Sequence, residues 1–319
     1  MTAATPTGPA LRSAFDPPAQ HVLTVPVSDE QRFETTAEFL AGGLVAGERV
    51  TFFDDGSADD VLGRMHDDGV DLHGPLRSGQ LQLAPPESTR HAVTMPLDEV
   101  PGLVTATVDG ALADGWSGLR FTGETCHALT NSAEYLLEHD HVVATTIEGR
   151  PARVLCVYDR LRFPERVVAD MCAAHTVQIE PVPLYDDSLL RITTDGPARV
   201  RLAGEVDHAN RPQVRRVLGR LIDRLLRGDE VPDEEAEAGV LVADLSALRF
   251  CDVAAAVSVV HAAAELPVTL RLRLDHVRPG VARLLDRCGS AFAPQLDVRV
   301  RERSPLTGAQ ARELGAGAA

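Results

Sequence analysis

The feature that most constrains the fold is an alternation of strand-like and helix-like segments between residues 21 and 183. Apolar runs such as "HVLTVPV" and "ERVTFF" predict buried strands. The segment 29–47 has apolar residues at helical spacing and glycines at its end, which predicts a helix. Strands separated by helices pair in parallel, so the pattern predicts a mostly parallel α/β sheet with helices on both faces.

The chain is long enough for two domains. It has 319 residues, more than one average domain needs. The stretch "VQIEPVPLYDD" contains two prolines and is typical of a linker. A hairpin, an amphipathic helix and further strand–helix pairs follow it. The sequence therefore predicts a disordered N-terminus at 1–19, a first domain at 20–183, a linker at 184–188, a second domain at 189–303 and a disordered tail at 304–319.

Composition excludes several classes of partner and compartment. The formal net charge of -16 argues against a nucleic-acid or anionic-membrane partner, because those surfaces need a basic footprint. The 5 cysteines show no paired spacing, which favours reduced thiols. We find no signal peptide and no apolar run near the ~20 residues of a membrane helix. A cytoplasmic protein is expected.

Catalytic motifs are missing from the sequence. Every basic side chain besides histidine is arginine, so no P-loop lysine exists. The stretch "DDGSADD", where a P-loop would lie, would repel phosphates. No Gly-x-Ser-x-Gly elbow occurs either. The sequence predicts a protein that is not an enzyme and has no cofactor; a residual ATPase that uses Glu124 is the weakest alternative.

Polar residues follow the predicted strands of the first domain. In open α/β sheets, ligands bind at the carboxyl ends of the strands. A small-molecule pocket is therefore expected there, and the alternative is that these are ordinary strand-end polar residues. The predicted pocket residues are Asp54, Asp55, Glu124, Cys126 and Tyr158.

Cysteines and histidines offer weak signals for a metal. Cys172 and His175 have i, i+3 spacing, Cys126 and His127 are adjacent, and Cys156 ends a strand. No CxxC pair exists, and zinc sites usually show tighter pairing along the chain. Buried free cysteine is common as a small hydrophobe. On spacing alone, no metal site is predicted.

Three stretches of the second domain resemble one family. They are "RVRLAGEVDHANRPQVRRVL", "VLVADLSALRFCDVAAA" and "LDHVRPGVARLLDRCG". In order and spacing they are similar to the STAS family of anti-sigma-factor antagonists and sulfate-transporter domains. The resemblance implies a small α/β fold and a surface that docks on an anti-sigma factor or another kinase-like regulatory protein. A homo-oligomer is also compatible with it.

The switch position of that family is altered in this chain. In phosphorylatable members a Ser or Thr directly follows the aspartate that matches Asp252, at a helix N-terminus where phosphate is favoured. Here Val253 stands in its place. The resemblance implies a docking face without its usual switch, and Ser246 is a weak candidate for a second phosphosite. The expected docking residues are Asp207, Ser246, Asp252, Val253, Ala254 and Ala255.

The first domain resembles a second family. The stretches "FLAGGLVAGERVTFF", "GLRFTGE" and "RVLCVYDRLRFPERVVADMCAAH" are similar to MEDS, the methanogen/methylotroph sensory domains. The resemblance implies a RecA-like domain, here without a P-loop, that senses a ligand. The expected protein is a cytoplasmic regulator with a sensory domain and a STAS output domain. The alternative is a small-molecule sensor whose STAS unit is only a scaffold or dimerisation module.

Overall fold

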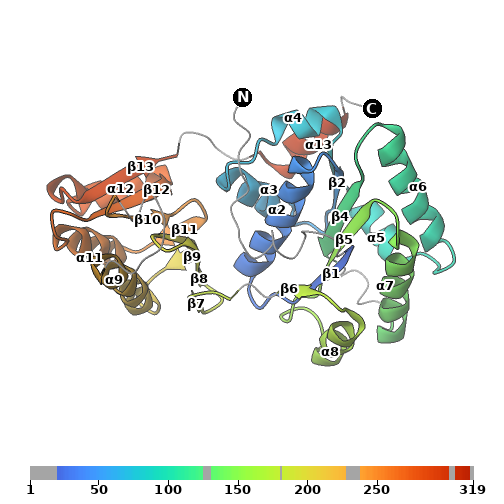
Figure 1. The fold of residues 1–319 in the computed structure, drawn as a ribbon, viewed down its shortest axis with the longest axis horizontal. Coiled ribbons are helices and arrows are strands. Elements are labelled where there is room, and N and C mark those ends of the chain that lie inside the picture. The colour runs from blue at the N-terminus through green and yellow to red at the C-terminus, as the bar shows by residue number, and fades with distance from the viewer. Residues whose placement is uncertain (1–19, 125–130, 180–181, 228–237, 302–305, 317–319) are drawn as a thin grey trace. The chain divides into compact units, whose positions relative to one another are not determined.

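The computed structural model describes residues 20–124, 131–179, 182–227, 238–301 and 306–316. The chain divides into an N-terminal unit, which includes residues 306–316, and a C-terminal unit that spans residues 182–301 (Figure 1). The N-terminus expected to be disordered, 1–19, lies outside the described residues. Among the described helices, none combines the length and apolarity of a membrane span.

The N-terminal unit is built on a parallel sheet of six strands in the order β3-β2-β4-β5-β1-β6. Strands buried on both faces need near-continuous apolar runs, which is why segments such as "RVTFF" form them. The strands are β1 (His21–Thr24), β2 (Arg49–Phe53), β3 (Leu81–Ala84), β4 (Leu119–Glu124), β5 (Ala152–Val157) and β6 (Gln178–Ile179).

Helices cover both faces of this sheet, as the alternation predicts (Figure 1). One face packs against α2 (Asp29–Val45), α3 (Ala58–Asp67) and α4 (His73–Ser78). The other packs against α5 (Pro86–Thr94), α6 (Val100–Ala113), α7 (Ala133–Ile147) and α8 (Glu165–Ala174). The sequence prediction missed α4, α5 and β6, because elements this short carry too few residues to show a period.

Two glycines let α2 approach the sheet closely. A Cβ on Gly43 would lie 2.7 Å from the Val50 side chain, and one on Gly42 would lie 2.7 Å from the guanidinium of Arg120. Arg120 is buried and donates to Glu48 at 2.6 Å and to the Phe39 carbonyl at 3.0 Å. The "AGG" of the MEDS-like stretch therefore makes room for a buried ion pair between Arg120 on the sheet and Glu48, which follows the helix.

The C-terminal tail corrects one prediction. Residues expected to be disordered form α13 (Gly308–Ala316), which packs on the N-terminal unit. Ala311 is fully buried in the core beside α3 and α4, and Arg312 lies 2.9 Å from the carboxylate of Asp54. Small side chains suit a closely packed helix, so the Ala/Gly-rich composition does not imply disorder here.

The C-terminal unit has a mixed sheet in the order β13-β12-β10-β9-β8-β7, with β11 also paired to β9. Among the described strand pairs of this unit, β7–β8 and β8–β9 are antiparallel and the others are parallel. The predicted hairpin is present as β8–β9. The strands are β7 (Tyr185–Asp186), β8 (Leu190–Gly196), β9 (Arg199–Val206), β10 (Val240–Asp244), β11 (Leu248–Cys251), β12 (Arg271–Val277) and β13 (Leu296–Val300).

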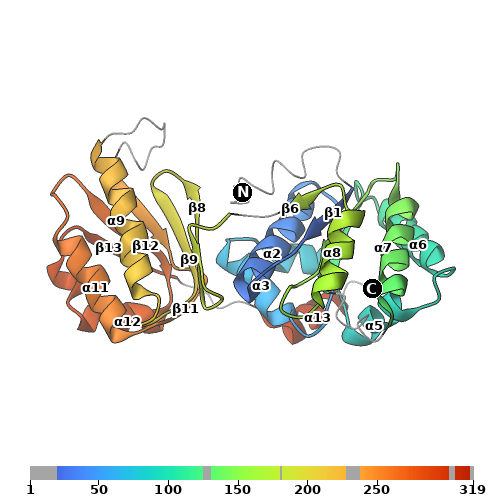
Figure 2. The same cartoon turned by 90° about the horizontal axis from the view of Figure 1, so that it is seen from below.

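Three helices share one core with this sheet. They are α9 (Arg211–Arg227), α11 (Val253–Ala264) and α12 (Pro279–Arg287), and they lie together over the strands (Figure 2). The predicted α/β class is confirmed: a six-stranded parallel sheet is followed by a smaller α/β unit. Two details differ from the sequence pattern. β7 lies inside the expected linker and pairs with β8. The apolar stretch 240–252, which predicts a single buried strand, is divided by a turn into β10 and β11.

We expect Ala311→Glu to destabilise the N-terminal unit by about 1–3 kcal/mol, because a charged side chain cannot fit the buried face of α13. Ala309 is exposed on the same helix, so Ala309→Glu is the matched control and should change little. Urea unfolding monitored by circular dichroism measures both. Equal stability of the two variants would show that α13 does not dock in solution.

Candidate functional site

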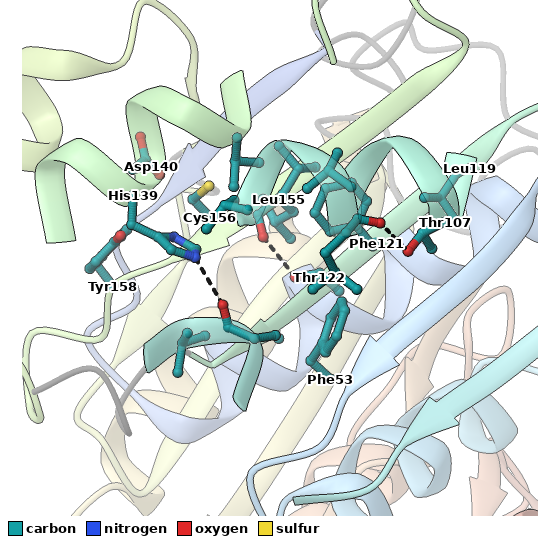
Figure 3. Close-up of a pocket in the computed structure, with 18 residues that line it drawn as sticks. Phe53, Thr107, Leu119, Phe121, Thr122, His139, Asp140, Leu155, Cys156 and Tyr158 are labelled. Atoms are coloured by element: carbon teal, nitrogen blue, oxygen red, sulfur yellow. Dashed lines mark hydrogen bonds between the residues drawn. The ribbon is translucent and has the colours of Figure 1, made fainter. Parts of the chain in front are cut away.

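A cavity of about 100 Å³ lies beneath β4 and β5 in the N-terminal unit. Its wall is largely apolar, with side chains from the sheet facing α5, α6 and α7 (Figure 3). Its lining residues are Phe53, Ala92, Val93, Val100, Leu103, Val104, Thr107, Leu119, Phe121, Thr122, Gly123, His139, Asp140, Val143, Val154, Leu155, Cys156 and Tyr158.

Several polar groups in the wall are already bonded to the backbone. Thr122 donates to the Leu155 carbonyl and Thr107 to the Leu103 carbonyl, both at 2.8 Å. His139 Nε2 lies 3.0 Å from the Ala92 carbonyl, so that nitrogen carries the proton and donates. Burial lowers the pKa of His139, which favours the neutral ring. The cavity therefore suits a small and mostly apolar molecule.

The predicted strand-end pocket is only partly present. Tyr158 lines the cavity, whereas Asp54 and Asp55 do not. Asp54 accepts from the backbone N–H groups of Gly56 and Ala58 and pairs with Arg312. Asp55 is bonded to Ser57. These two carboxylates hold the start of α3, which corrects their assignment to the pocket.

Two other predicted pocket residues cannot be placed there. Glu124 ends β4, where its backbone pairs with Val157. Cys126 lies outside the described residues. The sequence prediction missed the wall contributed by α5 and α6. The signal for it was the apolar stretch 100–108, which has more apolar residues than one buried helix face needs.

Four side chains gather beside the cavity, in an arrangement that chain spacing did not predict. His21, Asp140, Cys156 and His175 place one N, O or S atom each within 4.8 Å of one another. They come from β1, α7, β5 and the residue that ends α8. The rings of His21 and His175 stack with centroids 4.1 Å apart. Cys172, which the spacing argument paired with His175, is not a member of this cluster.

The protonation of this cluster is shaped by burial. Burial alone would raise the pKa of Asp140, but hydrogen bonding to His21 and electrostatic interactions with His21 and His175 hold that pKa below its usual value. Burial raises the pKa of Cys156 well above its ordinary value and lowers the pKa of His175. The structure thus concentrates metal-ligand side chains where the expectation was that no metal site exists.

The N-terminus of α11 forms the second candidate site. Asp252 caps the helix, because its carboxylate accepts from the Ala255 N–H at 2.6 Å. Val253, the first helical residue, is 62% exposed, and Phe250, two residues before the cap, is 49% exposed. Ala254 is also exposed. The site presents apolar side chains where the family's hydroxyl would stand.

Three other predicted docking residues differ in their exposure. Asp207 follows β9 and accepts from the Ala209 N–H at 2.8 Å, and its side chain is partly exposed. Ala255 is buried against the core. Ser246 is fully buried, and its hydroxyl accepts from Arg201 at 3.0 Å. Neither Ala255 nor Ser246 is accessible to a partner or a kinase in this fold, which corrects their place in the docking set.

The motif that carries the second-domain resemblance has a structural role. Asp244 accepts from the Ser246 N–H at 2.9 Å, faces His276 Nδ1 at 3.3 Å and lies 3.9 Å from Arg201. Burial opposes its ionisation, but the Arg201 charge and these hydrogen bonds hold the pKa of Asp244 well below its usual value. The carboxylate fixes the turn that leads from β10 to β11.

Comparison with known families assigns both units. Residues 20–176 match the family model described as MEthanogen/methylotroph, DcmR Sensory domain, or MEDS. Residues 191–302 match the STAS domain. The chain therefore carries an N-terminal MEDS domain and a C-terminal STAS domain, and both sequence resemblances are confirmed. These are sensory and regulatory domain types rather than typical catalytic ones.

Two solved structures are similar to part of the chain. An uncharacterized protein from Pyrococcus horikoshii, crystallised in complex with an unknown peptide, is 12% identical with a TM-score of 0.41, over 54% of this chain and 82% of that one. The flagellar accessory protein FlaH from Methanocaldococcus jannaschii is 10% identical with a TM-score of 0.39, over 64% of this chain and 88% of that one. No curated protein matches the chain.

We expect Asp244→Asn to destabilise the C-terminal unit by about 2–3 kcal/mol at pH 7, because it removes the buried negative charge that faces Arg201 and His276. A lowered carboxyl pKa stabilises the fold above its unfolded value, about 3.9, and that contribution fades as pH falls toward the folded value. The gap between variant and wild type should therefore shrink below about pH 4.

Urea unfolding at several pH values checks this, with Asp223→Asn on the exposed face of α9 as the control. A gap that stays constant from pH 7 to acid would contradict the role given to the Asp244 charge.

Proposed function

We propose that the protein is a regulator in which the MEDS domain binds a small, mostly apolar molecule and the STAS domain docks on an anti-sigma factor with a kinase-like fold. The proposal includes no catalytic turnover. The observation that carries it is the exposed apolar tip formed by Phe250 and Val253 beside the cap Asp252, in a STAS domain whose remaining frame is intact.

The tip is suited to protein binding by its chemistry. Exposed apolar side chains next to a helix N-terminus combine an apolar contact with free backbone N–H groups. Arg211 on α9 lies 3.5 Å from the Asp252 carboxylate, so the cap is held by two elements. Without a hydroxyl at position 253, the tip has no phosphorylation site at the family's switch position, and binding is constitutively permitted.

Val253→Asp is the direct test. An aspartate at the first helical position is favoured by the helix dipole, so the fold should be retained. Its charge on the apolar tip should weaken binding to a kinase-like anti-sigma factor at least tenfold, or about 1.4 kcal/mol. Calorimetry against the purified anti-sigma factors of the source organism measures the change.

Val268→Asp is the matched control, because Val268 is 88% exposed in the same unit but follows the far end of α11. It should bind like the wild type. If no anti-sigma factor binds the wild-type chain, or if the two variants weaken binding equally, the docking proposal is wrong.

The sensory half of the proposal rests on the cavity beneath β4 and β5. Apolar cavities of this kind bind small apolar probes such as benzene. A ligand present at 100 times its dissociation constant would stabilise the MEDS domain by about 2.7 kcal/mol. The volume, about 100 Å³, is below that of a drug-sized pocket, so the ligand class is a molecule of a few heavy atoms.

We expect benzene to raise the melting temperature of the full chain and Val104→Phe to abolish that rise, because Val104 lines the cavity from α6. Leu112→Phe is the control, since Leu112 lies on the same helix and is not among the lining residues. No rise with benzene or short-chain alcohols in the wild type would contradict the pocket.

The alternative is a small-molecule sensor whose STAS unit is only a scaffold or a dimerisation module. The cavity supports its sensing part equally well. The partner-binding and ligand-binding experiments above distinguish the two hypotheses. Ligand binding without any effect of Val253→Asp on a partner would favour the alternative.

A further inference from the structure

The cluster of His21, Asp140, Cys156 and His175 is not explained by packing alone. Asp140 and His175 are buried, and each of the four residues offers an atom type that ligates transition metals. The four residues belong to separate elements, and α7, β1, β5 and the end of α8 converge on one point. A metal site needs several ligand atoms close together, whereas a packed core does not require polar side chains to be grouped in this way.

The spacing of the donor atoms fits one small cation. Zinc bonds of about 2.0–2.3 Å put the ligand atoms of a tetrahedral site roughly 3.3–3.6 Å apart. His21 Nε2 lies 3.3 Å from Asp140 Oδ2 and 3.3 Å from Cys156 Sγ. His175 Nε2 lies 3.5 Å from the same Asp140 oxygen. The remaining pairs of ligand atoms lie within 4.8 Å of each other, so small side-chain movements would bring all four to the spacing of a tetrahedral site.

One histidine is already held in a metal-binding tautomer. His175 Nδ1 lies 2.9 Å from the Met171 carbonyl, which only accepts, so Nδ1 carries the proton. In the neutral ring, Nε2 then presents a lone pair, and among the described residues this buried atom has no hydrogen-bond partner. It faces a carboxylate oxygen, another acceptor. A cation between the two would satisfy both, and a carbonyl-anchored ring is the usual arrangement for a histidine ligand.

We propose that this cluster binds one divalent transition metal of the zinc class, with two imidazoles, one thiolate and one carboxylate as ligands. Nitrogen and sulfur donors favour this class over magnesium or calcium, which take oxygen ligands. Cys156 would bind as the thiolate, and its proton would pass to solvent when the metal enters. The site goes beyond the proposed sensing and docking functions. Asp140 and Cys156 also line the cavity, so the metal would lie in its wall.

The test uses the full chain, stripped with a chelator and titrated with Co²⁺ and then Zn²⁺. One equivalent of Co²⁺ should give the visible bands of a tetrahedral site and a thiolate charge-transfer band, and Zn²⁺ should displace both. Cys156→Ser should lose the charge-transfer band. Cys172→Ser, a half-buried cysteine on α8 outside the cluster, should keep it. His175→Gln should weaken Co²⁺ binding at least tenfold.

Circular dichroism shows that each variant is folded before it is scored. A folded wild-type chain without a thiolate–cobalt band would overturn the proposal and leave a proton-bridged histidine–carboxylate pair as the cluster's role. A band unchanged in Cys156→Ser would also overturn it. These outcomes are independent of benzene binding and of the anti-sigma factor experiments.

Discussion

The buried ion pair between Arg120 and Glu48 is the constraint on which the N-terminal unit depends. A guanidinium inside a sheet core is costly unless every donor is matched, so α2 must lie where Glu48 and the Phe39 carbonyl reach it. A Cβ at position 43 would lie 2.7 Å from the Val50 side chain and 2.9 Å from the Arg120 stem, so glycine there permits that approach. Because neighbours on a strand face opposite ways, Leu119 and Phe121 then face α6 and α7 and become cavity wall.

Much of the fold could be predicted from local pattern, and the sites could be predicted only in part. The alternation of strands and helices predicts the parallel sheet, because the spacing of apolar residues and the order of the elements can both be read from neighbouring residues. The cap at Asp252 was equally visible, since one residue type at one helix end makes it. Strand-end logic placed Asp54 and Asp55 in a pocket, but their nearest unsatisfied partners were the N–H groups of their own loop. Hydrogen bonds to the loop occupy these two carboxylates, so they are not available to a ligand.

The remaining features depend on contacts far apart in the sequence. Arg312 pairs with Asp54, which lies far away in the sequence. The Ala/Gly-rich composition of the tail therefore gave no sign that α13 packs on the N-terminal unit. His21 and His175 lie near opposite ends of the N-terminal unit in the sequence, and the fold places both of them next to Asp140. Metal-ligand spacing along the chain is informative for loops that fold around an ion. It is uninformative when two strands, one helix and the end of another helix each contribute one side chain to a cluster.

Val253 changes the thermodynamic character of any regulation at the α11 tip. A phosphorylation switch operates away from equilibrium, because each cycle consumes a nucleoside triphosphate. The phosphorylated state then persists until a phosphatase removes the phosphate. A valine at 62% exposure can hold no such mark. A partner docked here would exchange at equilibrium, with occupancy set at every moment by concentrations and the dissociation rate. Such a regulator has no memory of past signals, and its response can be no slower than unbinding.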